Sequence, residues 1–290
     1  MEKLFQSLSL AEFTQRFQTE QDCYDALIDQ KWGDGYLCRK CKHTKYCKGI
    51  KAHDRQCTKC SYLESPTADT LFHHVKFSLL SAFKIVYFVA TNKKGITSTE
   101  LSRKLNIRQK TCWLFKQKVM QAMESNNVNP LEGEIELVHL TLGNQRRNKE
   151  VKEKLEKRKV VLAIEKKTKG AARVYGMVLK DDQEGNFKEF IETKLSADAH
   201  ITTIDNVSFF KRNNIIFDDS KKGKFTVGKR VMHTFKSWLK GIHGRVELLQ
   251  YYINEYCYRH NRHRMKGEIF DDLLKRMVRH KPAPYHVIIS

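Results

Sequence analysis

The sequence predicts an α+β multidomain protein, in which a cysteine-rich module and a helical region precede an α/β core. Three observations predict this fold class. Two Cys-x-x-Cys pairs lie within residues 38–60, apolar residues recur at helical spacing up to residue 123, and short runs of β-branched residues begin near residue 135. The 290 residues are enough for two or three compact domains.

The composition is strongly basic, with 54 Lys and Arg against 33 Asp and Glu and a formal charge of +21. Such an excess favours a polyanionic partner, with nucleic acid the first candidate and an anionic membrane surface the second. No apolar run approaches the roughly 20 residues of a spanning helix, and no secretory signal is visible. We therefore expect a cytoplasmic, nucleoid-associated protein without a membrane partner, whose cysteines bind metal rather than form disulfides.

Residues 1–34 are predicted to form short N-terminal helices. Ser9-Leu10-Ala11-Glu12 marks the start of one helix, with Phe13 and Phe17 at helical spacing, and Thr19-Glu20-Gln21-Asp22 marks the start of the next.

Residues 35–75 carry the pattern of a zinc ribbon. Cys38-Arg-Lys-Cys41 and Cys57-Thr-Lys-Cys60 are separated by fifteen residues. Each pair can direct two thiolates to a point about 2.3 Å away, so two pairs complete a tetrahedron around Zn²⁺. Metal-free cysteines packed in a core are the alternative. Cys47 is expected to be a spare thiol, and the isolated cysteines are expected to be core residues: Cys23, Cys112 and Cys257.

Eight Lys and Arg but one Asp lie between Tyr36 and Tyr62. These cations could contact DNA phosphates, which is the interpretation we prefer. They could instead offset the negative charge of the metal site or form a solvated basic face.

Residues 76–128 are predicted to form a helical DNA-binding region. One helix is expected from Phe77 to Thr91 and three more between Gly95 and Met123. Within them, Thr97 or Ser98 can cap a helix that turns Leu101 and Leu105 inward, Asn106 tolerates a left-handed turn, and a second helix opens at Gln109 with Trp113 as its anchor.

This order is typical of a helix-turn-helix, although a plain helical hairpin has the same pattern. The residues predicted to face the major groove or the phosphates are Arg108, Gln109, Lys110 and Lys116.

Residues 133–265 switch to an α/β pattern. The segments predicted as strands are 135–142, 160–164, 173–179 and 201–204, and those predicted as helices are 186–195, 228–241 and 245–260. This order suggests a nuclease-like core. Its basic stretches add four predicted DNA contacts, Arg146, Arg147, Lys236 and Lys240. Residues 266–290 are expected to form a C-terminal tail.

The order of these parts resembles the ISXO-type insertion-sequence transposases across most of residues 20–262. Ser65-Pro-Thr-Ala-Asp-Thr-Leu-Phe-His73 is similar to the family's Ser-x-Thr-x-Gly-Thr-Leu-Phe-His, with Asp69 in place of Gly. Leu101–Leu105 and Lys110–Trp113 follow in the expected places. Phe235–Gly241 and Tyr258–Arg262 are similar to the family's Phe-x-Ser-Leu-Leu-Lys-Gly and Tyr-Arg-x-Asn-Arg.

The resemblance implies an RNase H-like core in which two strand-borne Asp and a helix-borne Glu or Asn hold two divalent metals. Glu136 and Gly143 align with the family's first strand, but its metal-binding Asp falls on Val138. The second Asp falls on Ile204, with Asp205 one residue late, which on a strand faces the opposite side. The third position falls on His233.

Val, Ile and His cannot supply the oxygen ligands that Mg²⁺ requires. The resemblance therefore implies a zinc-containing, transposase-derived DNA-binding protein, regulatory or architectural, that does not cut DNA. One alternative is an active Mg²⁺-dependent transposase or nuclease that uses displaced ligands, Asp205 with Glu136 or Asp218/Asp219. Others are a zinc site formed by His139 and His233, and a protein-interaction scaffold. A second copy of the chain or another protein stays open as a partner.

Overall fold

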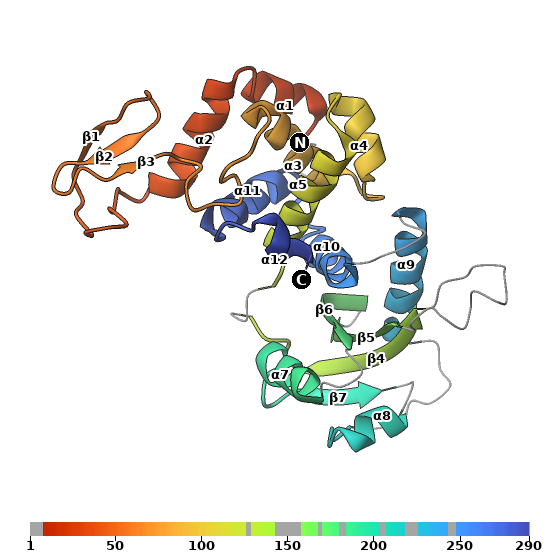
Figure 1. Cartoon of the computed structure of the whole chain (residues 1–290). Helices are drawn as coiled ribbons and strands as arrows, with labels where there is room; N and C mark the ends of the chain where they lie inside the picture. The colour runs from red at the N-terminus through yellow and green to blue at the C-terminus, as the bar shows by residue number, and fades with distance from the viewer. Residues whose placement is uncertain are drawn as a thin grey trace, which may run out of the picture. The chain divides into compact units, whose positions relative to one another are not determined.

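The computed structural model describes residues 8–125, 129–142, 158–167, 170–179, 184–203, 207–217, 226–242 and 248–289 (Figure 1). Helices and strands both occur, so the chain is an α+β protein. It divides into two compact units, residues 1–123 with 265–290, and residues 124–264. None of the helices in these described ranges is long and apolar enough to cross a membrane.

The first unit opens with two capped helices, α1 (Leu10–Arg16) and α2 (Glu20–Trp32). Ser9 Oγ accepts a hydrogen bond from the backbone N–H of Glu12, and the Glu12 carboxylate accepts one from the backbone N–H of Ser9. Thr19 and Asp22 form the same reciprocal pair. Both predicted helix starts are confirmed, because each satisfies backbone donors that a helix leaves open at its N-terminus.

A small antiparallel sheet follows, with strands in the order β1-β2-β3. Its strands are short: β1 (Tyr46–Lys48), β2 (Arg55–Cys57) and β3 (Leu63–Glu64). The chain then passes through Asp69, whose φ of 58° lies in the left-handed region that favours glycine. The transposase motif that residues 65–73 resemble has Gly at this position. Here the Asp69 carboxylate lies 3.1 Å from the Arg39 guanidinium.

The remaining helices of this unit are α3 (Leu79–Thr91), α4 (Ser98–Leu105) and α5 (Gln109–Ala122), then η2 (Lys266–Glu268), α11 (Ile269–Arg279) and α12 (Tyr285–Ile289). Only two helices occupy the range in which three were predicted. No break divides the second helix, because the polar residues Lys116 and Gln117 are buried inside the continuous helix α5.

The prediction of a C-terminal tail at residues 266–290 is wrong. Phe270 of α11 is fully buried, and its ring lies 5.6 Å from that of Phe13 and 6.2 Å from that of Phe83. Arg16 of α1 also forms an ion pair with Asp271 at 2.8 Å. The periodic apolar face of α11 therefore completes the core of the N-terminal helices.

The second unit contains a four-stranded sheet in the order β6-β5-β4-β7. Its strands are β4 (Glu134–Leu142), β5 (Arg158–Lys167), β6 (Gly170–Leu179) and β7 (His200–Thr203). β4, β5 and β6 pair antiparallel, whereas β7 pairs parallel with β4, with Leu137 opposite Thr203. All four strands lie where the β-branched runs predicted them.

Helices cover both faces of this sheet. Helices α7 (Glu184–Lys194) and α8 (Val207–Arg212) place Phe187, Phe190 and Phe210 against Ile135 and Leu137. On the other face lie α9 (Val227–Ile242) and α10 (Leu249–Asn261). Strand alternation explains the division, since residues 136 and 138 of β4 point away from residues 135 and 137. Helix α8 was not predicted.

Helix α10 also closes the outer edge of β6 with side-chain amides. Asn261 Oδ1 accepts a hydrogen bond from the Val174 N–H at 2.7 Å, and Asn261 Nδ2 donates to the Val174 carbonyl at 2.9 Å. Gln250 bonds in the same way to the Val178 N–H and the Gly176 carbonyl. Gly176 permits this approach, because a Cβ there would lie 2.7 Å from Ile253 Cγ2.

We expect Asn261→Ala to lower the free energy of unfolding by roughly 1–3 kcal/mol, because it leaves a partly buried backbone N–H and carbonyl without partners. Urea denaturation of the variant and of an Arg264→Ala control, whose side chain is exposed, measures the difference. Equal stability of the two variants would contradict this role for Asn261.

Candidate metal centre and nucleic-acid interface

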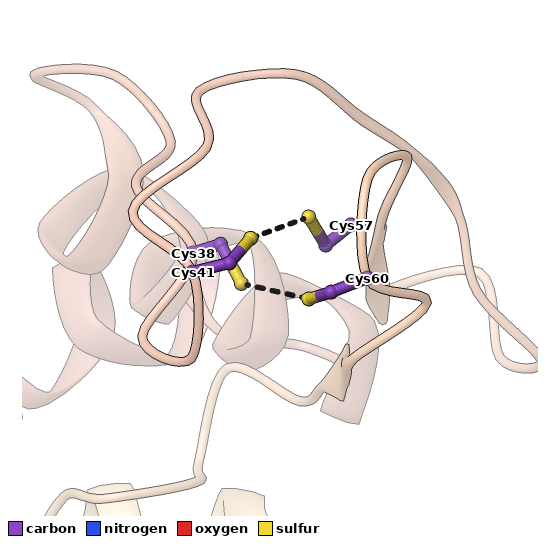
Figure 2. Close-up of side chains that lie close together, drawn as sticks. All are labelled: Cys38, Cys41, Cys57 and Cys60. Carbon is purple, nitrogen blue, oxygen red and sulfur yellow. Dashed lines mark hydrogen bonds between the residues drawn. The ribbon is translucent and has the colours of Figure 1, made fainter.

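The four cysteines of the two Cys-x-x-Cys pairs converge in the first unit (Figure 2). Their sulfur atoms all lie within 4.8 Å of one another. Cys38 Sγ is 3.6 Å from Cys60 Sγ, and Cys41 Sγ is 3.5 Å from Cys57 Sγ. Four sulfurs about 2.3 Å from one ion would be about 3.8 Å apart at the corners of a tetrahedron. The arrangement is compatible with a structural zinc site.

The two halves of this site have the same backbone geometry. The Lys42 N–H donates to the Cys38 carbonyl at 2.8 Å, and the Ser61 N–H donates to the Cys57 carbonyl at 3.0 Å. Lys42 and Ser61, each directly after its second cysteine, have φ of 59° and 56°. Each turn therefore directs its two thiols towards the centre of the cluster through the same backbone conformation.

The electrostatics of the cluster favour a bound cation. Burial disfavours the Cys38 thiolate, but backbone hydrogen bonds from Cys41 and Lys40 lower the pKa of Cys38 to about 6. A backbone hydrogen bond from Tyr62 favours the Cys60 thiolate, whereas burial and the three neighbouring thiols raise the pKa of Cys60 to about 12. Thiolates this close repel one another, and a metal ion removes that repulsion.

Helix α2 packs against the cysteine cluster. Trp32 and Tyr36 pack with the buried Cys38 and Cys57 in one apolar cluster. The Arg55 guanidinium carbon lies 4.4 Å from the centre of the Trp32 ring and 4.1 Å from that of Tyr46. Arg55 therefore links the sheet to helix α2 by cation–π contacts, and its guanidinium is occupied by these rings.

Two further basic residues near the centre are held by carboxylates. Lys31 Nζ lies 2.8 Å from the buried Glu64 carboxylate, and Arg39 lies 3.7 Å from it. Carboxylates of the same chain therefore neutralise part of the excess of Lys and Arg. Besides Arg39, which is also exposed, the exposed cations of this module are Lys40, Lys42, Lys45, Lys48, Lys51 and Lys59.

The four cysteines outside the two Cys-x-x-Cys pairs do not all have the same exposure. Cys23, Cys112 and Cys257 are buried, as predicted, whereas Cys47 is exposed and its thiol donates to the Gln56 carbonyl.

Helices α4 and α5 are joined by a tight turn at Asn106. Thr97 Oγ1 accepts from the Glu100 N–H and caps α4, and Asn106 has φ of 52°. The first residues of the two helices then meet, because Gln109 Nε2 donates to Ser98 Oγ at 2.7 Å. The predicted cap, left-handed turn and second helix start are all present.

Three of the four polar residues predicted to contact DNA here are exposed at the start of α5: Arg108, Gln109 and Lys110. The fourth prediction, Lys116, is wrong. Its side chain is only 1% exposed, since it lies two turns into α5 among residues that pack against α3 and α11. Lys110 Nζ also lies 5.8 Å from the Tyr285 ring centre, so α12 borders this surface.

In the second unit, the two predicted metal positions that the structure describes, Val138 and His233, are not brought together. Val138 is fully buried on β4, and a Cβ on Gly228 of α9 would lie 2.6 Å from Val138 Cγ2. His233 is exposed on α9, whereas Val231 and Phe235 of that helix are buried. The His139 ring lies 4.9 Å from Phe209, on the opposite sheet face from Val138, so His139 and His233 do not form a zinc site.

A buried charge cluster lies beside Val138 instead. The Glu136 carboxylate is fully buried and accepts a short hydrogen bond from Thr226 Oγ1. Lys166 Nζ of β5 lies 3.6 Å from Glu136 Oε2 and donates to Thr202 Oγ1 at 3.1 Å. The sequence alone does not reveal the role of Lys166, because its partner depends on the pairing of β5 with β4.

Several predicted residues fall outside the described ranges: Ile204, Asp205, Asp218, Asp219, Gly143, Arg146 and Arg147. Lys236 and Lys240 both lie on α9, partly exposed and exposed respectively. Among the described residues, the four cysteines form the one group of three or more His, Cys, Asp or Glu side chains whose ligand atoms converge.

Comparisons of this chain with protein-family models, with curated proteins and with solved structures find no match.

Proposed function

We propose that this chain is a transposase-derived, zinc-containing DNA-binding protein that acts without cutting DNA, as a regulator or an architectural subunit associated with the nucleoid. The observation that carries the proposal is the junction of α4 and α5. There a left-handed Asn106 turn leaves Arg108, Gln109 and Lys110 exposed at the start of the second helix. In helix-turn-helix proteins, the N-terminal residues of the second helix contact base edges in the major groove.

The Ser98–Gln109 hydrogen bond supports this assignment. It restrains the Gln109 amide at the first turn of α5, between two exposed cations. A restrained amide beside cations suits a surface that binds phosphates and presents one polar group to the bases.

Zinc is the metal that we propose for the four cysteines. Tetrahedral sites with four thiolates are typical of structural Zn²⁺, and the absence of an open ligand position suits a structural role. With zinc bound, the ribbon would be held against α2 and would present its exposed lysines to the phosphate backbone.

The fold of the second unit supports the proposed descent from a transposase. Three antiparallel strands, a helix and a fourth strand parallel to the first agree with the RNase H-like core that the resemblance implies. The apolar Val138 and the close approach of Gly228 support the absence of cutting, because neither offers an oxygen ligand to Mg²⁺.

We expect binding of the full chain to duplex DNA to weaken steeply with salt, and Arg108→Ala with Lys110→Ala to weaken it further. Loss of two phosphate contacts should reduce the slope of log affinity against log salt by about 2. Fluorescence anisotropy over a salt series measures both effects. Lys275→Ala with Arg279→Ala removes two exposed cations from α11 and serves as the charge-matched control.

Two outcomes would overturn the proposal. Salt-insensitive binding, or no binding to DNA, would remove the DNA claim and favour a protein-interaction scaffold. Nicking of DNA that depends on Mg²⁺ or Mn²⁺ and is lost in Asp205→Ala would establish an active enzyme.

A further inference from the structure

Helix α9 of the second unit carries basic residues and no acidic residue. Lys229, His233, Lys236 and Lys240 recur at intervals of three and four residues, which places them on one side of the helix, with Arg230 beside them. Arg230, His233 and Lys240 are exposed, and Lys229 and Lys236 are partly exposed. We call these five residues the α9 basic face.

The cations of the α9 basic face differ from three other cations of the same unit, which are paired. Arg173, Arg259 and Lys166 are held by carboxylates of Glu165, Glu255 and Glu136. Within the described part of the chain, Lys229, Arg230, Lys236 and Lys240 form no ion pair. Four cations along one helix that pair with none of the described carboxylates create a positive potential that favours an anionic partner.

The position of α9 on the sheet is fixed by its other side. Val231, Phe235 and Leu239 are buried, and Gly228 brings the backbone against Glu136 and Val138. Thr226 just before the helix donates to Glu136, and Thr234 Oγ1 lies 2.7 Å from the Tyr256 hydroxyl. The α9 basic face is thus presented by a helix that is anchored at its start and along its length.

We propose that the α9 basic face binds the sugar–phosphate backbone of duplex DNA, as a second contact separate from the start of α5. This inference rests on the proposed DNA-binding function. A membrane surface fits less well, because an amphipathic helix binds lipid through its apolar side, and that side of α9 is buried in the core. Four of its five residues are Lys or Arg, and it carries no exposed Phe, Tyr or Trp for stacking on bases, so we infer that it contacts phosphates without reading sequence.

The test compares two full-length variants that each lose three positive charges from the second unit. Lys229→Gln, Lys236→Gln and Lys240→Gln alter the α9 basic face. Lys211→Gln, Arg212→Gln and Arg264→Gln remove three exposed cations elsewhere. Affinity is measured on a duplex that the wild-type chain selects from a random pool and on its scrambled version, over a salt series. Circular dichroism melts check that both variants fold.

The α9 variant should bind both duplexes at least about tenfold more weakly, by the same factor, with a salt slope lower by about 2 to 3. The control variant should lose much less. By contrast, Gln109→Ala, which removes the amide that we propose faces the bases, should weaken the two duplexes unequally.

Equal losses in the two triple variants would overturn the inference, because net charge alone would then explain them. So would unchanged DNA binding of the α9 variant together with lost binding to phosphatidylserine vesicles. Failure of the wild-type chain to bind DNA would instead remove the proposed function itself.

Discussion

A Cys38→Ser, Cys57→Ser variant should lose both its metal and its folded cysteine module. The wild-type chain should contain about one zinc per molecule, and the variant should contain none, because each half of the site loses one thiolate. Zinc binding stabilises comparable small modules by roughly 10–16 kcal/mol, which exceeds what three strands of two or three residues can supply. Elemental analysis gives the metal content, and limited proteolysis within residues 38–60 reports unfolding.

The effect should reach α2 as well. Trp32 and Tyr36 pack on the cysteines, and Arg55 is stacked on Trp32, so loss of the module exposes these rings and changes Trp fluorescence. Cys47→Ser is the matched control, since this thiol is exposed and lies outside the cluster. A wild-type chain that is free of zinc but resists proteolysis in this region would contradict the assignment.

Lys166→Met should cost the second unit about 3–5 kcal/mol of unfolding free energy, because it leaves the fully buried Glu136 without its cation. Urea denaturation measures the loss. Lys167→Met, one residue further along the same strand and exposed, should change stability by less than about 0.5 kcal/mol.

The double variant Glu136→Gln, Lys166→Met separates the pair from the packing around it. Replacing both charges removes the uncompensated carboxylate, so most of the lost stability should return. If the double variant is as unstable as the sum of the two single variants, the two side chains do not act as a pair.

Local signals in the sequence predicted the elements well. The Ser9 and Thr19 caps, the left-handed Asn106 and the alternation along β4 each depend on neighbours within a few residues, so they can be read without the fold. The convergence of the four cysteines could also be predicted from local sequence, because the short segment between the two Cys-x-x-Cys pairs leaves few arrangements in which the pairs can meet.

What could not be predicted depends on contacts between distant segments. Lys116 looked like a surface cation, but the turns of α5 that pack against α3 and α11 bury it. His233 was placed near Val138 by resemblance to a motif, whereas the helix turn that meets Val138 carries Gly228. The position of α11 in the N-terminal core links residues about 250 apart in sequence, as in the Arg16–Asp271 pair, and no local pattern contains that information.

The amide contacts from α10 to β6 bear on how this chain can associate with copies of itself. A bare outermost strand can recruit the same strand from a neighbouring molecule and begin a ribbon of indefinite length. Here Gln250 and Asn261 already occupy hydrogen-bonding positions along that strand, much as a neighbouring strand would. Any self-assembly of the chain would therefore use another surface, and a high local concentration of copies need not lead to fibrils through this border of the sheet.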